Sequence, residues 1–331
     1  MTTLSRGEPA LAARARAAQA VMSVVVPTFR RGNRLALFLE RLSRIERAAQ
    51  LDVLIVDQTP GADHDDLSGF RRFFASLRFL KLDAANVALA RNAGAIEARA
   101  GMLLFVDDDM ELEVRFASTL LALAHSAPRT AFGGMWENLG EPRRDADALT
   151  PKQSANSPLP HKGEGDSSAL SFVAEFLPSG VLAVRRDDFF AVGGFDERLN
   201  RYFEDAELSH RLKQAGFQLV KDERLRAIHH EEKTNGTWYS PSLREAASTL
   251  ARQQAYFMRK TGRSWPRTVW TLARTVVSEA RNPAYLRKGN AVSRAIMLAL
   301  AAPAALFFAA KRPALRSSAP RPERAGDIFG R

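Results

Sequence analysis

Cysteine is absent from the 331 residues of this chain. The fold therefore has no disulfide and no thiolate metal site, which fits a reducing compartment, and any bound metal must use oxygen or histidine ligands. Long apolar segments are also lacking. The uncharged stretch at 295–310 is shorter than the roughly 20 residues that span a bilayer, and Pro303 interrupts it. We expect it to lie on a membrane surface or to pack on protein.

We expect no secretory signal either. Residues 1–20 are rich in Ala and Arg and have no apolar core of the kind that a signal peptide needs. We expect them to form an N-terminal appendage and the protein to be cytoplasmic.

Acidic residues are outnumbered, and the net charge is +11. The basic excess is most evident at 244–331, where Arg and Lys alternate with Trp, Phe and Leu. Such a segment favours an anionic surface as partner. Zinc-finger spacing and the aromatic signature of RNA-recognition motifs are absent, so we expect no nucleic acid partner. Peripheral contact with the inner face of the cell membrane is the preferred interpretation.

Strand and helix patterns alternate along the first half of the chain. Apolar runs at 22–26, 53–56, 77–82 and 102–106 predict strands, and helical spacing predicts helices at 33–50 and 86–100. This βαβ order is typical of an α/β fold with a mostly parallel sheet. Ligands bind at the carboxyl ends of such strands, where Pro27, Thr28, Asp57 and the acidic run 107–109 would meet.

Three consecutive carboxylates, Asp107, Asp108 and Asp109, follow an apolar strand. Side chains alternate along a strand, so we expect Asp107 and Asp109 to face one site and Asp108 to point elsewhere. Carboxylate oxygens suit Mg²⁺ or Mn²⁺. The alternative is a solvated acidic turn.

The second half of the chain contains two more strand candidates, at 172–177 and 181–184, after a long loop at 137–170. That loop is rich in Pro, Ser and Gly and is either a lid or disordered. Glu204 and Asp205 begin a helix that should end at Gly216, where acidic residues also suit the helix dipole. His229 and His230 close a strand and are candidate metal ligands.

Taken in order, four motifs resemble the inverting family-2 glycosyltransferases with the GT-A fold, of the bacterial surface-polysaccharide type. They are Val24 to Phe29, Asn86 to Gly94, the acidic run 107–109, and Gly193 to Asp196 leading into Glu204 and Asp205. The resemblance covers about 23–230.

The resemblance implies a role for each candidate residue. Asp205 would be the general base that deprotonates the acceptor hydroxyl, and Glu204 would support it. Mn²⁺ or Mg²⁺ would be bound by Asp109 with His229 or His230, and His229 is preferred. The nucleotide-diphosphate sugar, with UDP as the guessed nucleotide, would contact Pro27, Thr28, Asp57, Arg91, Asp107 and Asp108.

The resemblance also implies a layout: an appendage at 1–20, a GT-A catalytic domain at 21–240, and a basic helical region at 241–331. Gln58 stands where many relatives have a second acid, which weakens the prediction of base recognition. The Gln-Xaa-Xaa-Arg-Trp motif of processive synthases is absent. We therefore expect transfer of one sugar to a glycan or polyprenyl-linked acceptor.

Two other functions remain open. One is a non-catalytic module that binds nucleotide sugars or acts as a membrane scaffold, although the presence of Asp205 argues against it. The other is a phosphatase of the haloacid-dehalogenase type, which also places Asp-Xaa-Asp after a strand.

Overall fold

The computed structural model describes residues 19–31, 34–138, 171–230 and 243–281, together with isolated positions between 296 and 309. Most of the expected appendage and of the long loop at 137–170 lies outside these residues.

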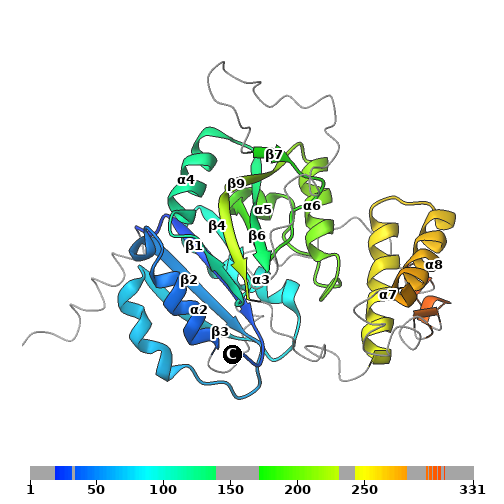
Figure 1. The fold of residues 1–331 in the computed structure, drawn as a ribbon, viewed down its shortest axis with the longest axis horizontal. Helices are drawn as coiled ribbons and strands as arrows, with labels where there is room; N and C mark the ends of the chain where they lie inside the picture. The colour runs from blue at the N-terminus through cyan, green and yellow to red at the C-terminus, as the bar shows by residue number, and fades with distance from the viewer. Residues whose placement is uncertain are drawn as a thin grey trace, which may run out of the picture.

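A single nine-stranded sheet forms the centre of the molecule (Figure 1). Its order is β3-β2-β1-β4-β8-β6-β9-β5, and β7 pairs with β9. The first four strands are parallel, whereas β8 is antiparallel to both β4 and β6. The strands are β1 (Met22–Thr28), β2 (Leu51–Asp57), β3 (Ser76–Lys81), β4 (Met102–Val106), β5 (Met110–Leu112), β6 (Thr130–Asn138), β7 (Ser171–Val173), β8 (Val181–Arg185) and β9 (Gln218–His229).

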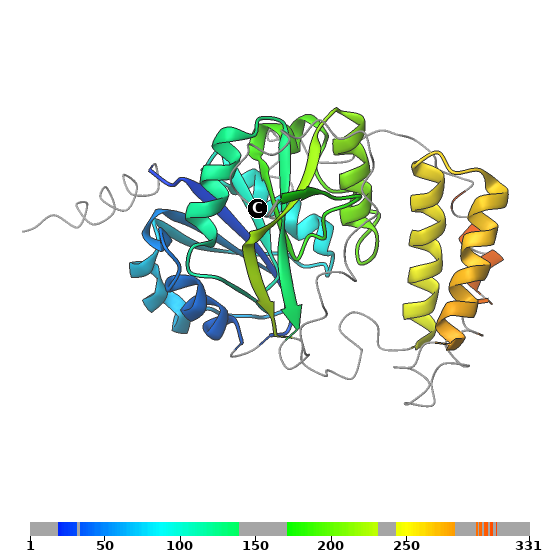
Figure 2. The ribbon, with the colours of Figure 1, turned by 45° about the horizontal axis from the view of Figure 1, so that its top comes forward.

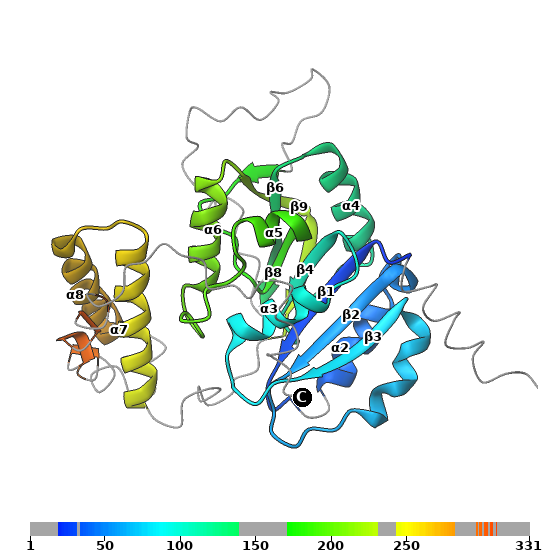
Figure 3. The same ribbon diagram turned by 180° about the vertical axis from the view of Figure 1, so that it is seen from behind.

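Helices cover both faces of this sheet. On one face, α2 (Arg34–Ser43) and α4 (Phe116–Ser126) share a core with alternate residues of β1 and β2. On the other face lie α3 (Val87–Glu97), α5 (Arg186–Ala191) and α6 (Glu204–Gln214). Figure 3 shows this second face, with α3 in front of the strands and α2 behind them. Strands buried on both sides explain the nearly continuous apolar runs in the sequence.

The predicted strands and their parallel order are confirmed, but two element bounds were wrong. The first helix ends at Ser43, not near 50, and is followed by a turn in which Arg47 adopts a left-handed backbone (φ 65°) before a short 3-10 helix at Ala48–Gln50. The strand predicted at 172–177 is only β7, which ends at Val173; further on, the amide of Leu177 donates to the Ser209 hydroxyl (3.0 Å).

Two long helices, α7 (Leu243–Lys260) and α8 (Trp265–Arg281), form a hairpin beside α6 (Figure 2). Gly262 makes the turn between them with a positive φ of 78°. Residues of both helices share a small core with Leu298, Ala305 and Ala309. Among the residues described, no helix combines the length and apolar character needed to cross a bilayer.

Candidate active site

The carboxyl ends of β1, β2 and β4 lie side by side, as the sequence predicted. Thr28 is in register with Asp57, and β4 runs parallel to β1 and ends at Val106, directly before the three aspartates. These strand ends place the predicted nucleotide and donor residues at one edge of the sheet.

The three aspartates themselves lie in a turn rather than on a strand. This acidic turn (Asp107–Asp109) is closed by the amide of Met110, which donates to the carbonyl of Asp107 (3.1 Å). The explanation by strand alternation was therefore wrong. Asp107 pairs with Arg91, whereas Asp108 and Asp109 share Arg31 as their cationic partner.

Asp108 has a buried position and is only 6% exposed. It accepts a hydrogen bond from the Thr28 hydroxyl (2.6 Å) and pairs with Nε of Arg31 (2.8 Å). Burial raises the pKa of Asp108 to about 7, although Arg31 and Thr28 oppose this change. These contacts give Asp108 a structural role in joining the end of β1 to the acidic turn, and its contact with substrate stays a prediction.

Asp109 lies between a guanidinium and an imidazole. It accepts from Nη2 of Arg31 (2.7 Å), and its Oδ1 lies 3.6 Å from Nε2 of His229. Burial opposes ionisation, but the nearby ring of His229 and the charge of Arg31 lower the pKa of Asp109. On the other side of the ring, Nδ1 of His229 contacts Oδ1 of Asn138 (3.0 Å), which directs Nε2 toward Asp109.

His230 has a different partner. Its Nε2 contacts Glu111 Oε2 (2.7 Å), while its backbone amide donates to the carbonyl of Asp109 (2.8 Å). The structure thus brings His229, and not the ring of His230, next to Asp109. Within the described part of the chain, no three His, Asp or Glu side chains are grouped as a complete metal site.

The pair of Asp109 and His229 nevertheless suits a divalent cation. Two ligands at about 2.1 Å from one ion lie roughly 3 Å apart when they are adjacent in its shell. Their 3.6 Å separation is close to that spacing. Mg²⁺ in particular is often held by one or two protein ligands together with substrate phosphates.

Arg91 links the acidic turn to the start of α6. It lies on α3, whose first turn is capped by the Asn86 side chain, and it is only 2% exposed. Its Nη2 donates to Asp107 (2.8 Å) and its Nη1 to Glu204 (3.1 Å). Burial alone would lower the pKa of Arg91, but the two carboxylates raise it. The guanidinium predicted near the nucleotide is thus occupied by protein carboxylates, and contact with the nucleotide stays a prediction.

Glu204 and Asp205 begin α6, as predicted. Glu204 is buried, whereas Asp205 is partly exposed, and its Oδ1 accepts from the amide of Ala206 (2.7 Å). Burial and the charge of Asp205 raise the pKa of Glu204 to about 7, against the effect of Arg91. Burial also raises the pKa of Asp205. A partly exposed carboxylate with a raised pKa is suited to accept a proton.

Asp57 lies at the end of β2 and is buried. It accepts from the amide of Thr59 (2.8 Å) and contacts Nε2 of His64 (2.9 Å), whose ring stacks on Phe79. Pro27 is buried within β1. His64 and Arg31 were missed from the sequence, since neither belongs to a motif.

The comparisons with known proteins agree with this fold. GalNAc-T7, solved with UDP, GalNAc and Mn²⁺, superposes with a TM-score of 0.56 at 16% identity over 76% of this chain and 51% of its own. The mannosyltransferase PcManGT of Pyrobaculum calidifontis, solved with GDP-Man and Mn²⁺, gives 0.52 at 16% identity over 88% and 86%. S. aureus TarS with UDP-GlcNAc gives 0.51 at 12% identity over 84% and 90%.

Two curated proteins are similar in sequence. The O-antigen biosynthesis protein RfbC of Myxococcus xanthus is 27% identical over 63% of this chain and 17% of its own length. An N-acetylglucosaminyl-diphospho-decaprenol L-rhamnosyltransferase of Mycobacterium tuberculosis is 40% identical over 23% of this chain and 22% of its own. The chain thus spans about a fifth of the length of these relatives. No family model matches it.

These likenesses remove the ground for the phosphatase alternative, because the acidic turn follows β4 of a sheet with glycosyltransferase topology. The chain has the GT-A fold of nucleotide-sugar transferases, and its sequence resembles bacterial polysaccharide glycosyltransferases.

Proposed function

We propose that this protein is an inverting glycosyltransferase that moves one sugar from a nucleotide-diphosphate donor to a hydroxyl of a glycan or lipid-linked acceptor. One observation supports this most strongly. A single guanidinium, that of Arg91, contacts both Asp107 of the acidic turn and Glu204, the neighbour of Asp205. A donor bound at the acidic turn would thus lie close to a carboxylate that can act as base.

Asp205 is the proposed base. The acceptor oxygen forms a bond to the anomeric carbon, its proton passes to the Asp205 carboxylate, and the bond to the nucleoside diphosphate breaks. Attack opposite the leaving group inverts the anomeric configuration. The raised pKa of Asp205 makes the carboxylate a stronger base than an exposed aspartate. Glu204 stays bound to Arg91 and positions the start of the helix.

Asp109 and His229 are the residues that would hold Mn²⁺ or Mg²⁺. Such an ion stabilises the negative charge that develops on a leaving diphosphate. The presence of Mn²⁺ in the GalNAc-T7 and PcManGT structures supports this assignment. Asp107, which is 37% exposed on its side chain, remains accessible for contact with the donor.

The nucleotide is proposed to lie at the ends of β1 and β2, beside Thr28 and Asp57. The structures of similar fold contain UDP, UDP-GlcNAc or GDP-Man, so the base and the sugar must come from experiment. A polyprenyl diphosphate-linked acceptor is supported by the name of the rhamnosyltransferase relative.

Such an acceptor would bring the protein to a membrane, and α8 offers a suitable face for anionic phospholipid. Trp270 (59% exposed), Val269 and Val277 are exposed on it. The guanidinium of Arg274 lies 5.4 Å from the Trp270 ring, so positive charge accompanies the apolar side chains. Trp270→Glu should reduce sedimentation with vesicles that contain phosphatidylglycerol, and binding to neutral vesicles alone would contradict the assignment.

The test of the activity is nucleotide release from UDP-, GDP- and dTDP-sugars with Mn²⁺ or Mg²⁺ and a polyprenyl-lipid extract. Wild type would be compared with Asp109→Asn, Asp205→Asn and the control Asp187→Asn, since Asp187 is exposed and lies two residues after Arg185, which pairs with the end of β4 opposite the acidic turn. We expect release from one donor, lost in the first two variants and kept in the third.

Chelation with EDTA should abolish release, and added metal should restore it. The anomeric proton coupling of the product would establish inversion. Full activity of Asp205→Asn would remove the proposed base. Donor binding without release under all conditions would favour the non-catalytic nucleotide-sugar module.

A further inference from the structure

We propose that α7 is a positioning element for the catalytic base, with Gln253 and Phe257 as the residues that hold the segment leading into Asp205. This inference rests on the function proposed above. It also extends the catalytic unit to Lys260, beyond the boundary at residue 240 expected from the sequence.

Gln253 binds the backbone just before α6. Its Oε1 accepts from the amides of Tyr202 (2.8 Å) and Arg201 (3.3 Å), and its Nε2 donates to the side chain of Asn200. Gln253 is buried. Both amides precede the first turn of α6, so no hydrogen bond within that helix can replace the contact. The side chain therefore determines where the chain enters the helix.

Phe257, one turn further along α7, contacts the next residue of the same segment. Its ring stacks on Phe203 with centroids 5.3 Å apart and an angle of 11°. Phe203 is the N-cap of α6 and has a left-handed backbone (φ 67°), and its side chain caps no amide. A bulky residue in this conformation costs free energy and persists only where its surroundings hold it. The stacked ring of Phe257 supplies such support two residues before Asp205.

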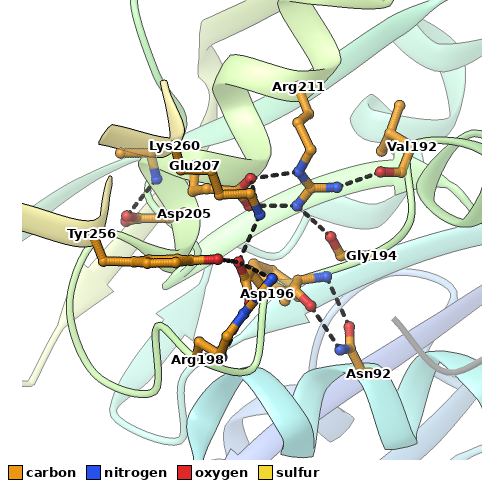
Figure 4. A network of polar contacts seen from close by, with 12 residues as sticks. Asn92, Val192, Gly194, Asp196, Arg198, Asp205, Glu207, Arg211, Tyr256 and Lys260 are labelled. Carbon is orange, nitrogen blue, oxygen red and sulfur yellow. Dashed lines mark hydrogen bonds and ion pairs between the residues drawn. The ribbon is translucent and has the colours of Figure 1, made fainter. Parts of the chain in front are cut away.

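The C-terminal turn of α7 is anchored on the catalytic domain by a buried ionic network (Figure 4). Nζ of Lys260 lies 2.6 Å from Asp196 and 2.7 Å from Glu207, and the Tyr256 hydroxyl donates to Asp196 (2.8 Å). Arg211 pairs with Glu207 from within α6. Lys260 of α7 and Arg211 of α6 therefore pair with the same carboxylate, Glu207, which joins the two helices.

The segment around Asp196 is held from its other side by α3. Asn92, next to Arg91, exchanges two hydrogen bonds of 2.9 Å with the backbone of Phe195. The loop at 196–203 is thus fixed at its start by α3 and α7 and at its end by Gln253 and Phe257. Because Asp205 is the second residue after this loop, α7 determines the position of the base without touching the reacting groups.

The test compares isosteric changes at Gln253 within the full chain. Gln253→Leu removes the acceptor at similar volume, whereas Gln253→Glu keeps acceptor oxygens for both amides. Arg252→Ala changes an exposed neighbour on the same helix and serves as the control. In Gln253→Leu we expect kcat to fall by about 10- to 100-fold with the KM for the donor unchanged, because a small misplacement of a catalytic group has effects of this size. Gln253→Glu should restore most of kcat, and the control should match wild type.

A second measurement does not depend on activity. Hydrogen exchange at the amides of residues 201 and 202 should accelerate at least about tenfold in Gln253→Leu and remain unchanged in the control. Unchanged exchange, or unchanged kcat in a folded Gln253→Leu, would overturn the proposal. A parallel fall in thermal midpoint, donor binding and kcat that Gln253→Glu fails to restore would also overturn it. If exchange is faster in Gln253→Leu but the wild type transfers no sugar, the result would support the contact made by Gln253 and refute the proposed function.

Discussion

Gly94 lies at a close approach of α3 to the sheet, and its replacement by alanine tests the packing that positions Arg91. A Cβ at residue 94 would lie 2.3 Å from Cγ1 of Val25 and 3.2 Å from Cγ2 of both Val25 and Val56. Ordinary contacts between carbons are about 3.5–4.0 Å, so the helix and β1 must separate by roughly 1 Å. Val25 is fully buried and β-branched, and it cannot rotate away easily.

We expect Gly94→Ala to lower the free energy of unfolding by about 2 kcal/mol. Overpacking of this kind costs about 3 kcal/mol or slightly more, and the higher helix propensity of alanine offsets about 1 kcal/mol. The midpoint of thermal unfolding should fall by roughly 4–8 °C in a chain of this size. Urea unfolding followed by circular dichroism would give the free energy directly.

A double-mutant cycle identifies the cause. Val25→Ala removes both methyl groups that collide with the new Cβ, so the double variant should be more stable than the sum of the two single effects by about 1–2 kcal/mol. Gly101→Ala is the control, because a Cβ there meets no atom within 4 Å. The close approach would be refuted if Gly94→Ala were as stable as wild type, or if its effect on stability simply added to that of Val25→Ala.

Three further predictions concern the site and its supports. The rate of transfer should rise with pH through the acidic range and then level, because the proposed base Asp205 must be ionised and burial raises its pKa; a flat profile from pH 4 to 8 would contradict this. Lys260→Met should destabilise the protein by about 3 kcal/mol or more in urea unfolding, because two buried carboxylates lose their shared cation. Gly180→Ala would put a methyl group 3.3 Å from Oδ2 of Asp107. It should raise the KM for the donor roughly tenfold with little change in thermal midpoint. An unchanged KM would indicate that Asp107 takes no part in donor binding.

The sheet was predictable because its signals are local. Apolar runs bounded by polar residues gave the parallel strands, and topology then required Thr28, Asp57 and the acidic turn to share an edge. Which aspartate has which role was not predictable in the same way. The acids lie in a turn, and their directions depend on Arg31 and Arg91, which approach from other segments.

The support from α7 was also beyond the reach of sequence patterns. Tyr256 and Asp196 are 60 residues apart, and Lys260 and Asp196 are 64 apart. The pattern of a basic amphipathic helix predicts an apolar face. It does not predict which buried carboxylate will pair with one of the helix's lysines. His64 was missed for a similar reason, since only the fold-back of the chain after β2 brings its ring to Asp57.

Arg91 explains why the acidic turn and the segment of the proposed base belong to one unit although they lie on different elements. The acidic turn follows β4, and Glu204 begins α6, more than 90 residues later in the chain. One buried guanidinium satisfies a carboxylate from each, and removing it would leave two acids without a counter-charge in a site that already holds a third, Asp205. The spacing between Asp107 and Glu204, the neighbour of the proposed base, is therefore bridged by one planar guanidinium on α3. Any displacement of α3 must change both ends of the site together.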